Sequence, residues 1–413
     1  MNNGAVNTDY DVIIMGGGLV GASLAACMAR DAALRIAVVE KFVPPQQQGE
    51  FHPSYDARNT ALANGTCHIF DQLGLWDQLR RNAVPIETIE ITEQGSFGKA
   101  VIRASEERVR ALGYVIENRY IGQALSGHLG NLANVDFLAP AQVIGLYYDG
   151  PEIVATVEQN GTQSRQRTPL LVIADGAESQ GRQLLGIASE SKAYEQVAIV
   201  TTVTPESPHQ NMALERFTSN GPLAILPQTD NRLGLTWCVA PQLADELMRV
   251  EDDVFLRRLE AVAGRGVGAL VQVGKRYRYP LALTLSKEQV RPNVVVLGNA
   301  AHGLHPVAGQ GFNMSMRDVA VLVQVLDKAR RLGRPAGDFR LLSDYLQRRV
   351  QDQRNTILFS DQLTKLFSNR STPLNLLRNS GLILFDSLRG TKRLVARHAM
   401  GRSVSTRLPE VTL

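Results

Sequence analysis

The sequence has few cysteines, few aromatic residues and no long apolar run. Its 413 residues include three cysteines, Cys27, Cys67 and Cys238, which lack the spacing of a metal site or a redox pair. Scattered cysteines of this kind are typical of a reduced, cytoplasmic protein. No stretch approaches the ~20 apolar residues that cross a bilayer, and the first residues do not resemble a secretory signal. The sequence therefore predicts a globular protein of two connected domains that does not span a membrane.

Positive and negative charges nearly balance over the whole chain, but they are unevenly distributed along it. Residues 376–413 contain seven basic and two acidic residues, a net charge of +5, so the preceding 375 residues sum to −1 out of the total of +4. Apolar residues in the same tail have the spacing of an amphipathic helix. Two interpretations stay open: a helix packed on its own domain, or contact with an anionic membrane surface or a partner. Because stacking aromatics do not alternate with the basic residues, nucleic acid is not predicted as a partner.

A glycine-rich turn near the start of the chain predicts a dinucleotide site. A buried parallel strand is expected at residues 10–15, a helix at 19–30 and a second strand at 35–39. Gly16, Gly18 and Gly21 separate the first strand from the helix, and Glu40 follows the second strand. The glycines permit a tight turn, close approach to a pyrophosphate and close helix packing, while Glu40 can accept hydrogen bonds from a ribose.

A second turn follows another apolar strand at residues 170–174. Asp175 and Gly176 come directly after this strand, at the edge of a sheet where ligands bind in open α/β folds. The alternative is a simple capping turn, in which Asp175 or Ser179 caps a helix and Arg182 lies on the surface.

The third segment, residues 298–318, follows a strand at 294–297. It is rich in glycine, contains Pro306, and leads into a helix expected to open at Asn313, whose free N–H groups could stabilise negative charge on a ligand. His302 and His305 suggest a metal site, but no third ligand accompanies them, so no metal is predicted.

The remaining pattern predicts an α/β protein in which one domain is assembled from separated pieces. A helical pattern covers residues 56–79 and another covers 243–263, while strands and turns dominate 197–239. The predicted organisation is a Rossmann-type FAD-binding domain, an inserted mixed or antiparallel substrate sheet, and a helical C-terminal region with a basic tail. The boundaries are 9–80, 121–185 and 286–330 for the FAD-binding parts, 81–120 and 186–285 for the substrate parts, and 331–413 for the C-terminal region.

The three segments together resemble the single-component FAD-dependent aromatic hydroxylases of the para-hydroxybenzoate hydroxylase type. Residues 56–62 (DARNTAL), 216–227 (RFTSNGPLAILP) and 279–284 (YPLALT) make the chain similar to the ubiquinone-biosynthesis hydroxylases within that family. The resemblance extends from about residue 9 to 400.

The resemblance implies a set of FAD contacts. Gly16, Gly18 and Gly21 would hold the pyrophosphate and Glu40 the adenosine ribose. Asn299 stands where most members have an aspartate against the ribityl chain, and it keeps an acceptor oxygen. The other implied cofactor residues are Arg58, Gln123, Asp175, Pro306, Gly309, Gly311, Phe312 and Asn313, the last two through N–H groups that face the flavin pyrimidine.

The resemblance also implies the reaction. NADPH or NADH would reduce FAD, and O2 would form a flavin C4a-hydroperoxide that hydroxylates a polyprenylphenol, at C1 of a 2-polyprenyl-6-methoxyphenol. The alternatives are C5 or C6 in the same pathway, a soluble phenol hydroxylase of aromatic degradation, a dehydrogenase that uses only the first motif, and a flavin-binding subunit that organises other ubiquinone-biosynthesis proteins. The implied location is cytoplasmic, with contact at the inner face of the membrane as an option.

A substrate pocket is expected between the FAD-binding domain and the inserted sheet. Phe217, Leu226 and Trp237 are its predicted lining, with ordinary sheet core favoured for Trp237. No catalytic base is assigned; His302, His305 and several tyrosines are candidates.

Overall fold

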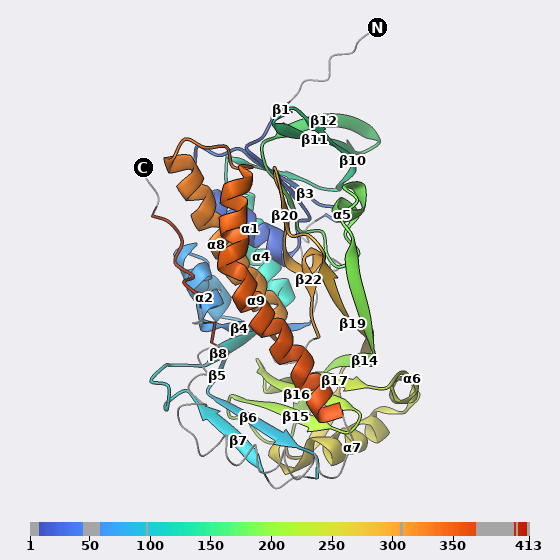
Figure 1. Ribbon diagram of the computed structural model, residues 1–413. Helices are drawn as coiled ribbons and strands as arrows, with labels where there is room; N and C mark the ends of the chain where they lie inside the picture. The colour runs from blue at the N-terminus through green and yellow to red at the C-terminus, as the bar shows by residue number, and fades with distance from the viewer. Residues whose placement is uncertain are drawn as a thin grey trace.

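The computed structural model describes residues 8–43, 58–95, 98–305, 309–368, 400–401 and 404–410. It has a central parallel sheet with helices on one face and a small antiparallel sheet on the other, and a second large sheet at the opposite end of the molecule (Figure 1). The predicted α/β fold with an inserted sheet and a helical C-terminal region is confirmed.

The central sheet consists of six strands in the order β20-β21-β13-β2-β3-β9, parallel except for β20. Its inner strands are short runs of valine, isoleucine and leucine buried on both faces, as parallel strands in α/β proteins are. Their bounds are β2 Val12–Met15, β3 Ile36–Val39, β9 Val135–Leu138, β13 Leu171–Ile173, β20 Val290–Arg291 and β21 Val294–Val296.

Side chains that alternate along these strands enter two separate cores. Val12, Ile14 and Val38 pack against the helices of one face, and Ile13 and Val39 pack against the small antiparallel sheet. The helices are α1 Leu19–Met28, α2 Asn64–Gln72, α4 Asn118–Leu129 and α8 Gln310–Arg331, with α3 Trp76–Arg80 beside them. The small sheet has the order β1-β12-β11-β10, with bounds Thr8–Asp9, Thr162–Thr168, Glu152–Gln159 and Ala141–Asp149.

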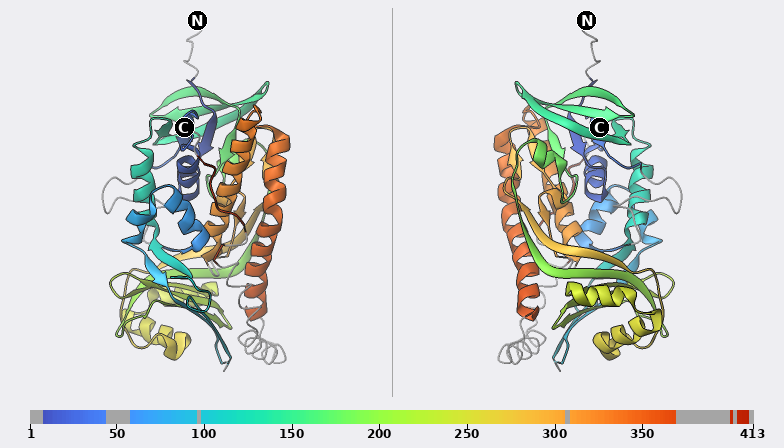
Figure 2. Two further views of the ribbon diagram at one scale, coloured as in Figure 1. Left: turned by 90° about the vertical axis from the view of Figure 1, so that its left-hand side faces the viewer. Right: turned by 90° about the vertical axis from the view of Figure 1, so that its right-hand side faces the viewer.

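The second large sheet has nine strands in the order β22-β19-β14-β17-β16-β15-β6-β7, with β18 paired to β14. The long strands β14 and β19 run from the central sheet into this second sheet (Figure 2). Bounds are β6 Thr88–Glu93, β7 Lys99–Arg103, β14 Ser189–Pro205, β15 Met212–Thr218, β16 Gly221–Gln228, β17 Arg232–Val239, β18 Leu270–Val273, β19 Tyr277–Ser286 and β22 His302–Gly303. A three-stranded sheet, β4-β8-β5, joins the two large sheets and consists of Asn59–Ala63, Gly113–Glu117 and Val84–Ile86.

The two faces of the nine-stranded sheet have different neighbours. Leu223 and Trp237 face outward and form a core with α6 Pro241–Arg249 and α7 Asp252–Ala263, where the Trp237 ring lies 6.0 Å from that of Phe255. Leu226, three residues after Leu223, lies on the opposite face and packs toward the three-stranded sheet. Trp237 is therefore ordinary sheet core, as the sequence favoured.

The C-terminal part of the chain crosses the whole molecule. Helix α9, Phe339–Ser368, packs beside α8 and extends toward the nine-stranded sheet (Figure 2). Residues 400–401 and 404–410 then lie back on α1, α2 and α8: Met400 and Leu408 are buried, and the Arg30 guanidinium donates to Pro409 O at 3.0 Å. Most of the predicted basic amphipathic segment falls in residues 369–399, outside the described residues.

Local structure differs from the sequence prediction in three places. Helix α8 begins at Gln310, three residues before its predicted start at Asn313. Residues 59–63, predicted as helix, form strand β4, because their backbone pairs with β8. The predicted helix at 243–263 is two helices, since Val250 and Glu251 adopt extended backbone with ψ values of 153° and 156°.

Candidate FAD-binding edge

The three glycine-marked segments meet at one edge of the central sheet. Strands β21, β13 and β2 are neighbours, so Gly298, Asp175 and Gly16 follow the ends of three adjacent strands. Backbone bonds continue past the strand ends: Ala174 N–H donates to Met15 O at 2.8 Å, and Leu297 N–H donates to Ile173 O at 2.8 Å. Ligands in open α/β sheets bind at this carboxyl edge.

The first turn is closely packed around its glycines. Gly16 has φ +98°, and a Cβ on Gly21 would lie 1.9 Å from Gly16 O. Only glycine fits at position 21, because any side chain there would push α1 away from β2. Among the described residues no side chain caps α1, so its first N–H groups can face a phosphate.

Glu40 is buried beside this turn. One carboxylate oxygen accepts from Gly17 N–H at 2.6 Å and the other accepts from Phe42 N–H at 2.9 Å. These bonds fix the carboxylate, and each oxygen keeps acceptor capacity for a ribose hydroxyl.

The second turn combines a cap with an available acceptor. Ser179 caps α5 (Gln180–Leu184), accepting from Arg182 N–H, and Asp175 Oδ2 accepts from Gly181 N–H at 2.8 Å. The other Asp175 oxygen is buried and finds no hydrogen-bond partner in the described part of the chain. The expectation that Arg182 lies on the surface is wrong, since its guanidinium is buried and donates to Ala177 O.

The third segment brings α8 to the same edge. A Cβ on Gly298 would lie 3.2 Å from the Val20 side chain of α1, so the first and third segments touch. Asn299 is exposed on the short 3-10 turn Gly298–Ala300. Helix α8 begins after Gly309, and a Cβ on Gly311 in its first turn would meet no described atom within 4 Å. Pro306 lies outside the described residues.

The Asn313 side chain holds the start of α8 against β4. Its Oδ1 accepts from Ala63 N–H and from the Thr66 hydroxyl, both at 2.8 Å. Its Nδ2 donates to Ala61 O at 2.7 Å and to Gly309 O at 3.0 Å. The sequence pointed to the Asn313 backbone but not to this side-chain role, which requires knowing that β4 is a strand.

Replacing Asn313 with aspartate is expected to destabilise the protein by about 3 kcal/mol. The carboxylate would face two carbonyl oxygens in place of the amide that donates to them. Urea unfolding measures the change. The matched control is Asn131→Asp, which removes an exposed amide donor to Gly127 O and should change stability little. Equal loss in both variants would contradict the role given to Asn313.

Arg58 and Gln123 lie at the corner where β4 meets α4. Arg58 O accepts from Asn118 N–H, the first residue of α4, at 2.9 Å. The Arg58 guanidinium lies 5.1 Å from the Tyr279 ring of β19, a cation–π distance. Gln123 is half-buried on α4.

The residues at this edge fit a flavin dinucleotide. The first glycine turn has no room for a Cβ atom at Gly21, and the carboxylate of Glu40, which could accept from a ribose, is held in place by hydrogen bonds. The start of α8 has open space beside Gly311. The FAD binding domain family matches residues 9–357. The chain belongs to this family.

Two relatives of this FAD-binding protein are named as hydroxylases. Ubiquinone hydroxylase UbiL of Rhodospirillum rubrum is 37% identical over 398 residues, covering 96% of this chain and 91% of that protein. The 3-demethoxyubiquinol 3-hydroxylase of Escherichia coli is 30% identical over 406 residues, covering 96% and 99%. The p-nitrophenol 4-monooxygenase PnpA from Pseudomonas putida has the same fold, with a TM-score of 0.80 at 17% identity, covering 97% and 100%. The chain is an FAD-dependent aromatic-ring hydroxylase.

A buried ionic network joins the third segment and α8 to α9. His302 Nε2 lies 2.8 Å from Asp318 Oδ2, and Asp318 Oδ1 accepts from Arg349 Nε of α9 at 2.5 Å. Arg349 and Arg317 both donate to Asp352, at 2.6 and 2.8 Å. Burial alone would raise the Asp318 pKa, but Arg349 and His302 outweigh it and the pKa is lowered. The His302 side chain is thus hydrogen-bonded to Asp318. Within the described ranges, no group of three or more His, Cys, Asp or Glu side chains is arranged to hold a metal ion.

His305 is a buried, neutral histidine of this hydroxylase. Burial lowers its pKa to about 4, with Asp361 acting in the opposite direction. In an unfolded chain the pKa is about 6.5, so the unfolded state takes up a proton first as the pH falls. Stability is full above pH ~6.5 and is lost progressively down to pH ~4, by about 3 kcal/mol.

We therefore expect His305→Gln to flatten part of the acid dependence of stability. Denaturant unfolding of wild type and variant at pH 7.5 and pH 4.5 measures the difference. The variant should lose less stability than wild type between the two pH values. An equal loss would show that His305 is as easily protonated in the folded protein as in the unfolded chain.

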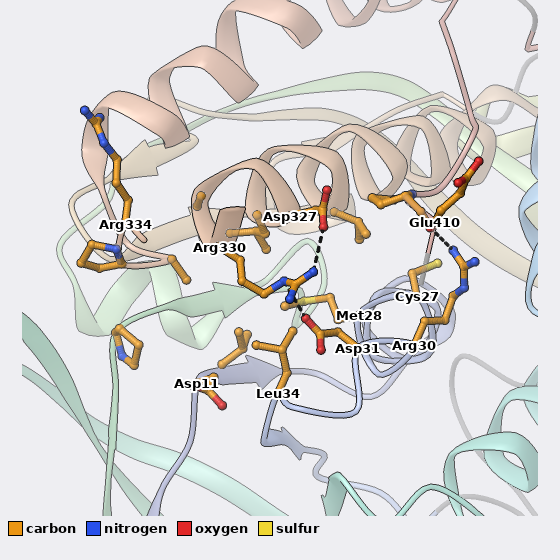
Figure 3. A pocket seen from close by; sticks show the side chains of 18 residues that line it. Asp11, Cys27, Met28, Arg30, Asp31, Leu34, Asp327, Arg330, Arg334 and Glu410 are labelled. Atoms are coloured by element: carbon orange, nitrogen blue, oxygen red, sulfur yellow. Dashed lines mark hydrogen bonds and ion pairs between the residues drawn. The ribbon is translucent and has the colours of Figure 1, made fainter. Parts of the chain in front are cut away.

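The hydroxylase also has a cavity of about 300 Å³ at the opposite edge of the central sheet (Figure 3). It lies between α1, α8 and Pro409–Glu410, with Val12, Met28 and Leu326 among its apolar walls. Arg330 crosses its rim, 3.0 Å from Asp31 and 3.4 Å from Asp327. None of the described residues predicted to bind FAD lines this cavity.

Proposed function

We propose that this hydroxylase acts on the aromatic ring of a polyprenylated phenol in ubiquinone biosynthesis, with FAD, O2 and NADPH or NADH. The observation that carries the proposal is its similarity, over almost the whole chain, to two hydroxylases named for ubiquinone and demethoxyubiquinol. The sequence resemblance implies C1 of a 2-polyprenyl-6-methoxyphenol as the ring position.

The proposed cofactor residues follow the sheet edge. Gly16, Gly18 and Gly21 with the start of α1 would bind the pyrophosphate, and Glu40 would bind the adenosine ribose. Asn299 would contact the ribityl chain, and the first turn of α8 would face the pyrimidine. Arg58, Gln123 and Asp175 would line the remaining length. When bound, FAD takes hydride from the nicotinamide and activates O2 for transfer to the ring.

The proposed substrate site lies between the FAD-binding edge and the inner face of the nine-stranded sheet. Leu226 packs on that face, and Phe217 is buried on the adjacent strand β15. An apolar site suits a prenylated ring and excludes water from the reacting oxygen. No helix among the described residues is long and apolar enough to cross a membrane. Because the substrate is a lipid, we propose a cytoplasmic enzyme that works at the inner surface of the membrane.

The test uses purified, FAD-loaded protein with short-chain prenylphenols under ¹⁸O2. The set contains three prenylphenols and p-nitrophenol. The first prenylphenol lacks the hydroxyl group at C1, the second lacks the one at C5, and the third lacks the one at C6. We expect one ¹⁸O atom in the product of a single prenylphenol, dependent on NAD(P)H and identified by mass spectrometry. The ring position follows from the compound that reacts.

Two controls keep the result specific. Apoprotein without FAD should give no labelled product, and deletion of the gene should cause the same prenylphenol to accumulate in lipid extracts. Labelling of p-nitrophenol alone would favour a soluble phenol hydroxylase. Unchanged quinones in the deletion strain would refute the proposal.

A further inference from the structure

Five side chains meet where the FAD-binding segment, the nine-stranded sheet and α9 come together. This junction cluster consists of Tyr194, Gln196, His305, Ser360 and Asp361. His305 Nε2 lies 3.3 Å from Gln196 Oε1, and the Tyr194 ring packs edge-on against the imidazole with centroids 4.9 Å apart. From α9, the Ser360 hydroxyl donates to His305 O and Asp361 accepts from the Tyr194 hydroxyl, both at 3.5 Å.

Hydrogen bonding fixes the state of His305. Gln196 Nε2 donates to Asn220 O at 3.2 Å, so its carbonyl oxygen faces the histidine. An amide oxygen only accepts, and His305 Nε2 must therefore carry the proton. The other ring nitrogen, Nδ1, is buried and has no hydrogen-bond partner among the described residues. The cluster consequently holds one neutral tautomer of a histidine that is 1% exposed.

A β-bulge presents the two β14 residues to His305. The register of β14 against β19 shifts between Ala193 and Val197, and Glu195 within the bulge has φ +54°. A positive φ at a glutamate is a strained conformation, and bulges of this kind re-aim side chains. Here the residues on either side of Glu195, Tyr194 and Gln196, both contact His305.

We propose that Gln196 and His305 are positioning residues that hold the end of the described segment 298–305 at a fixed place relative to the substrate sheet. His305 lies four residues before Gly309, where the turn into α8 begins, while Gln196 belongs to the sheet that carries the substrate face. The Gln196–His305 pair therefore sets the distance between the flavin and the substrate. Because the His305 imidazole is neutral, it places no buried charge between them. The inference rests on the proposed function.

The test compares Gln196→Leu, Gln196→Glu and the control Gln166→Leu in the full-length, FAD-loaded protein. Gln166 is a buried glutamine of β12 whose Nε2 donates to Ser164 Oγ at 3.1 Å, in the small sheet that carries none of the junction cluster and none of the proposed cofactor residues. Three quantities are measured: bound FAD per chain, H2O2 released per NAD(P)H oxidised in the presence of the prenylphenol, and KM for that phenol.

For Gln196→Leu we expect unchanged FAD content, at least about a fivefold rise in the H2O2 fraction and a higher KM, because small misplacements cost large factors in oriented reactions. Gln166→Leu should match wild type. An H2O2 fraction and KM equal to wild type in Gln196→Leu would overturn the proposal.

Gln196→Glu provides a readout that needs no turnover. A carboxylate at this position would raise the His305 pKa, so the imidazole would take up its proton at a higher pH than in wild type. Asp361 and Tyr194 are the other titratable groups that face the ring. We expect the absorbance of bound FAD to differ between pH 4.5 and pH 7.5 in the variant more than it does in wild type.

The outcomes separate the two proposals. A flavin spectrum in Gln196→Glu that does not change with pH would overturn the positioning role, whatever the substrate. A wild-type protein that hydroxylates none of the prenylphenols would refute the proposed function, and the spectral titration would still decide whether His305 and Gln196 act on the flavin segment.

Discussion

Purified Gly21→Ala protein is expected to contain less than about a tenth of the wild-type FAD. The added Cβ would lie 1.9 Å from Gly16 O, so α1 must move away from β2 and the turn between them must open. Overpacking at a rigid site costs about 1–3 kcal/mol, and each 1.4 kcal/mol lowers affinity tenfold. The flavin absorbance per chain after gel filtration measures the result.

Gly127→Ala is the matched control. Gly127 lies inside α4 and a Cβ there would meet no described atom within 4 Å, so alanine should leave FAD content unchanged and favour the helix slightly. Circular dichroism establishes that both variants are folded. Full FAD occupancy in a folded Gly21→Ala protein would contradict the assignment of this turn to the cofactor.

Replacing Arg349 with methionine is expected to lower the free energy of unfolding by about 3–5 kcal/mol. The change removes one partner of a buried ion pair and leaves Asp318 with His302 and Gln353. Burial of Asp318 is complete, so water cannot replace the guanidinium. Urea unfolding at neutral pH measures the loss.

The neighbouring residue provides the comparison. Arg348 is exposed and donates to Gln324 Oε1 on the surface, so Arg348→Met should cost less than about 1 kcal/mol. If the two variants were equally stable, the network between α8 and α9 would contribute nothing beyond an exposed contact.

The convergence of the cofactor segments could be predicted from sequence because its signals are local. Each of the strands before Gly16, Asp175 and Gly298 is an apolar, β-branched run followed at once by a turn. Parallel strands of this kind share a sheet, and their carboxyl ends share an edge. Gly16, Asp175 and Gly298 therefore come together without any long-range information beyond the fold class.

Strand β4 could not be predicted because pairing overrides propensity. Its sequence, Asn59–Ala63, contains alanine and leucine, which favour helices, and it runs directly into helix α2 at Asn64. Only the ladder with β8 makes it a strand. The side-chain role of Asn313 depends on that strand, so it was missed for the same reason.

The buried network depends on contacts far apart in sequence. Asp318 and Arg349 are 31 residues apart, on two helices whose packing the sequence does not state. Each looks like a surface charge when only its own helix is considered. For Trp237 the favoured prediction of ordinary sheet core is confirmed, because its ring packs against Phe255 of α7.

The strand order of the central sheet determines when the enzyme can first acquire its cofactor. The neighbours β2 and β13 are separated by more than 150 residues, and β21 and α8 are made later still, so the ribosome must complete about four fifths of the chain before the proposed FAD-binding edge exists. FAD capture is thus a late event in biosynthesis. Until then the apolar strands are exposed and need protection from aggregation. In cells short of riboflavin, finished chains would accumulate without FAD, the ligand that stabilises them.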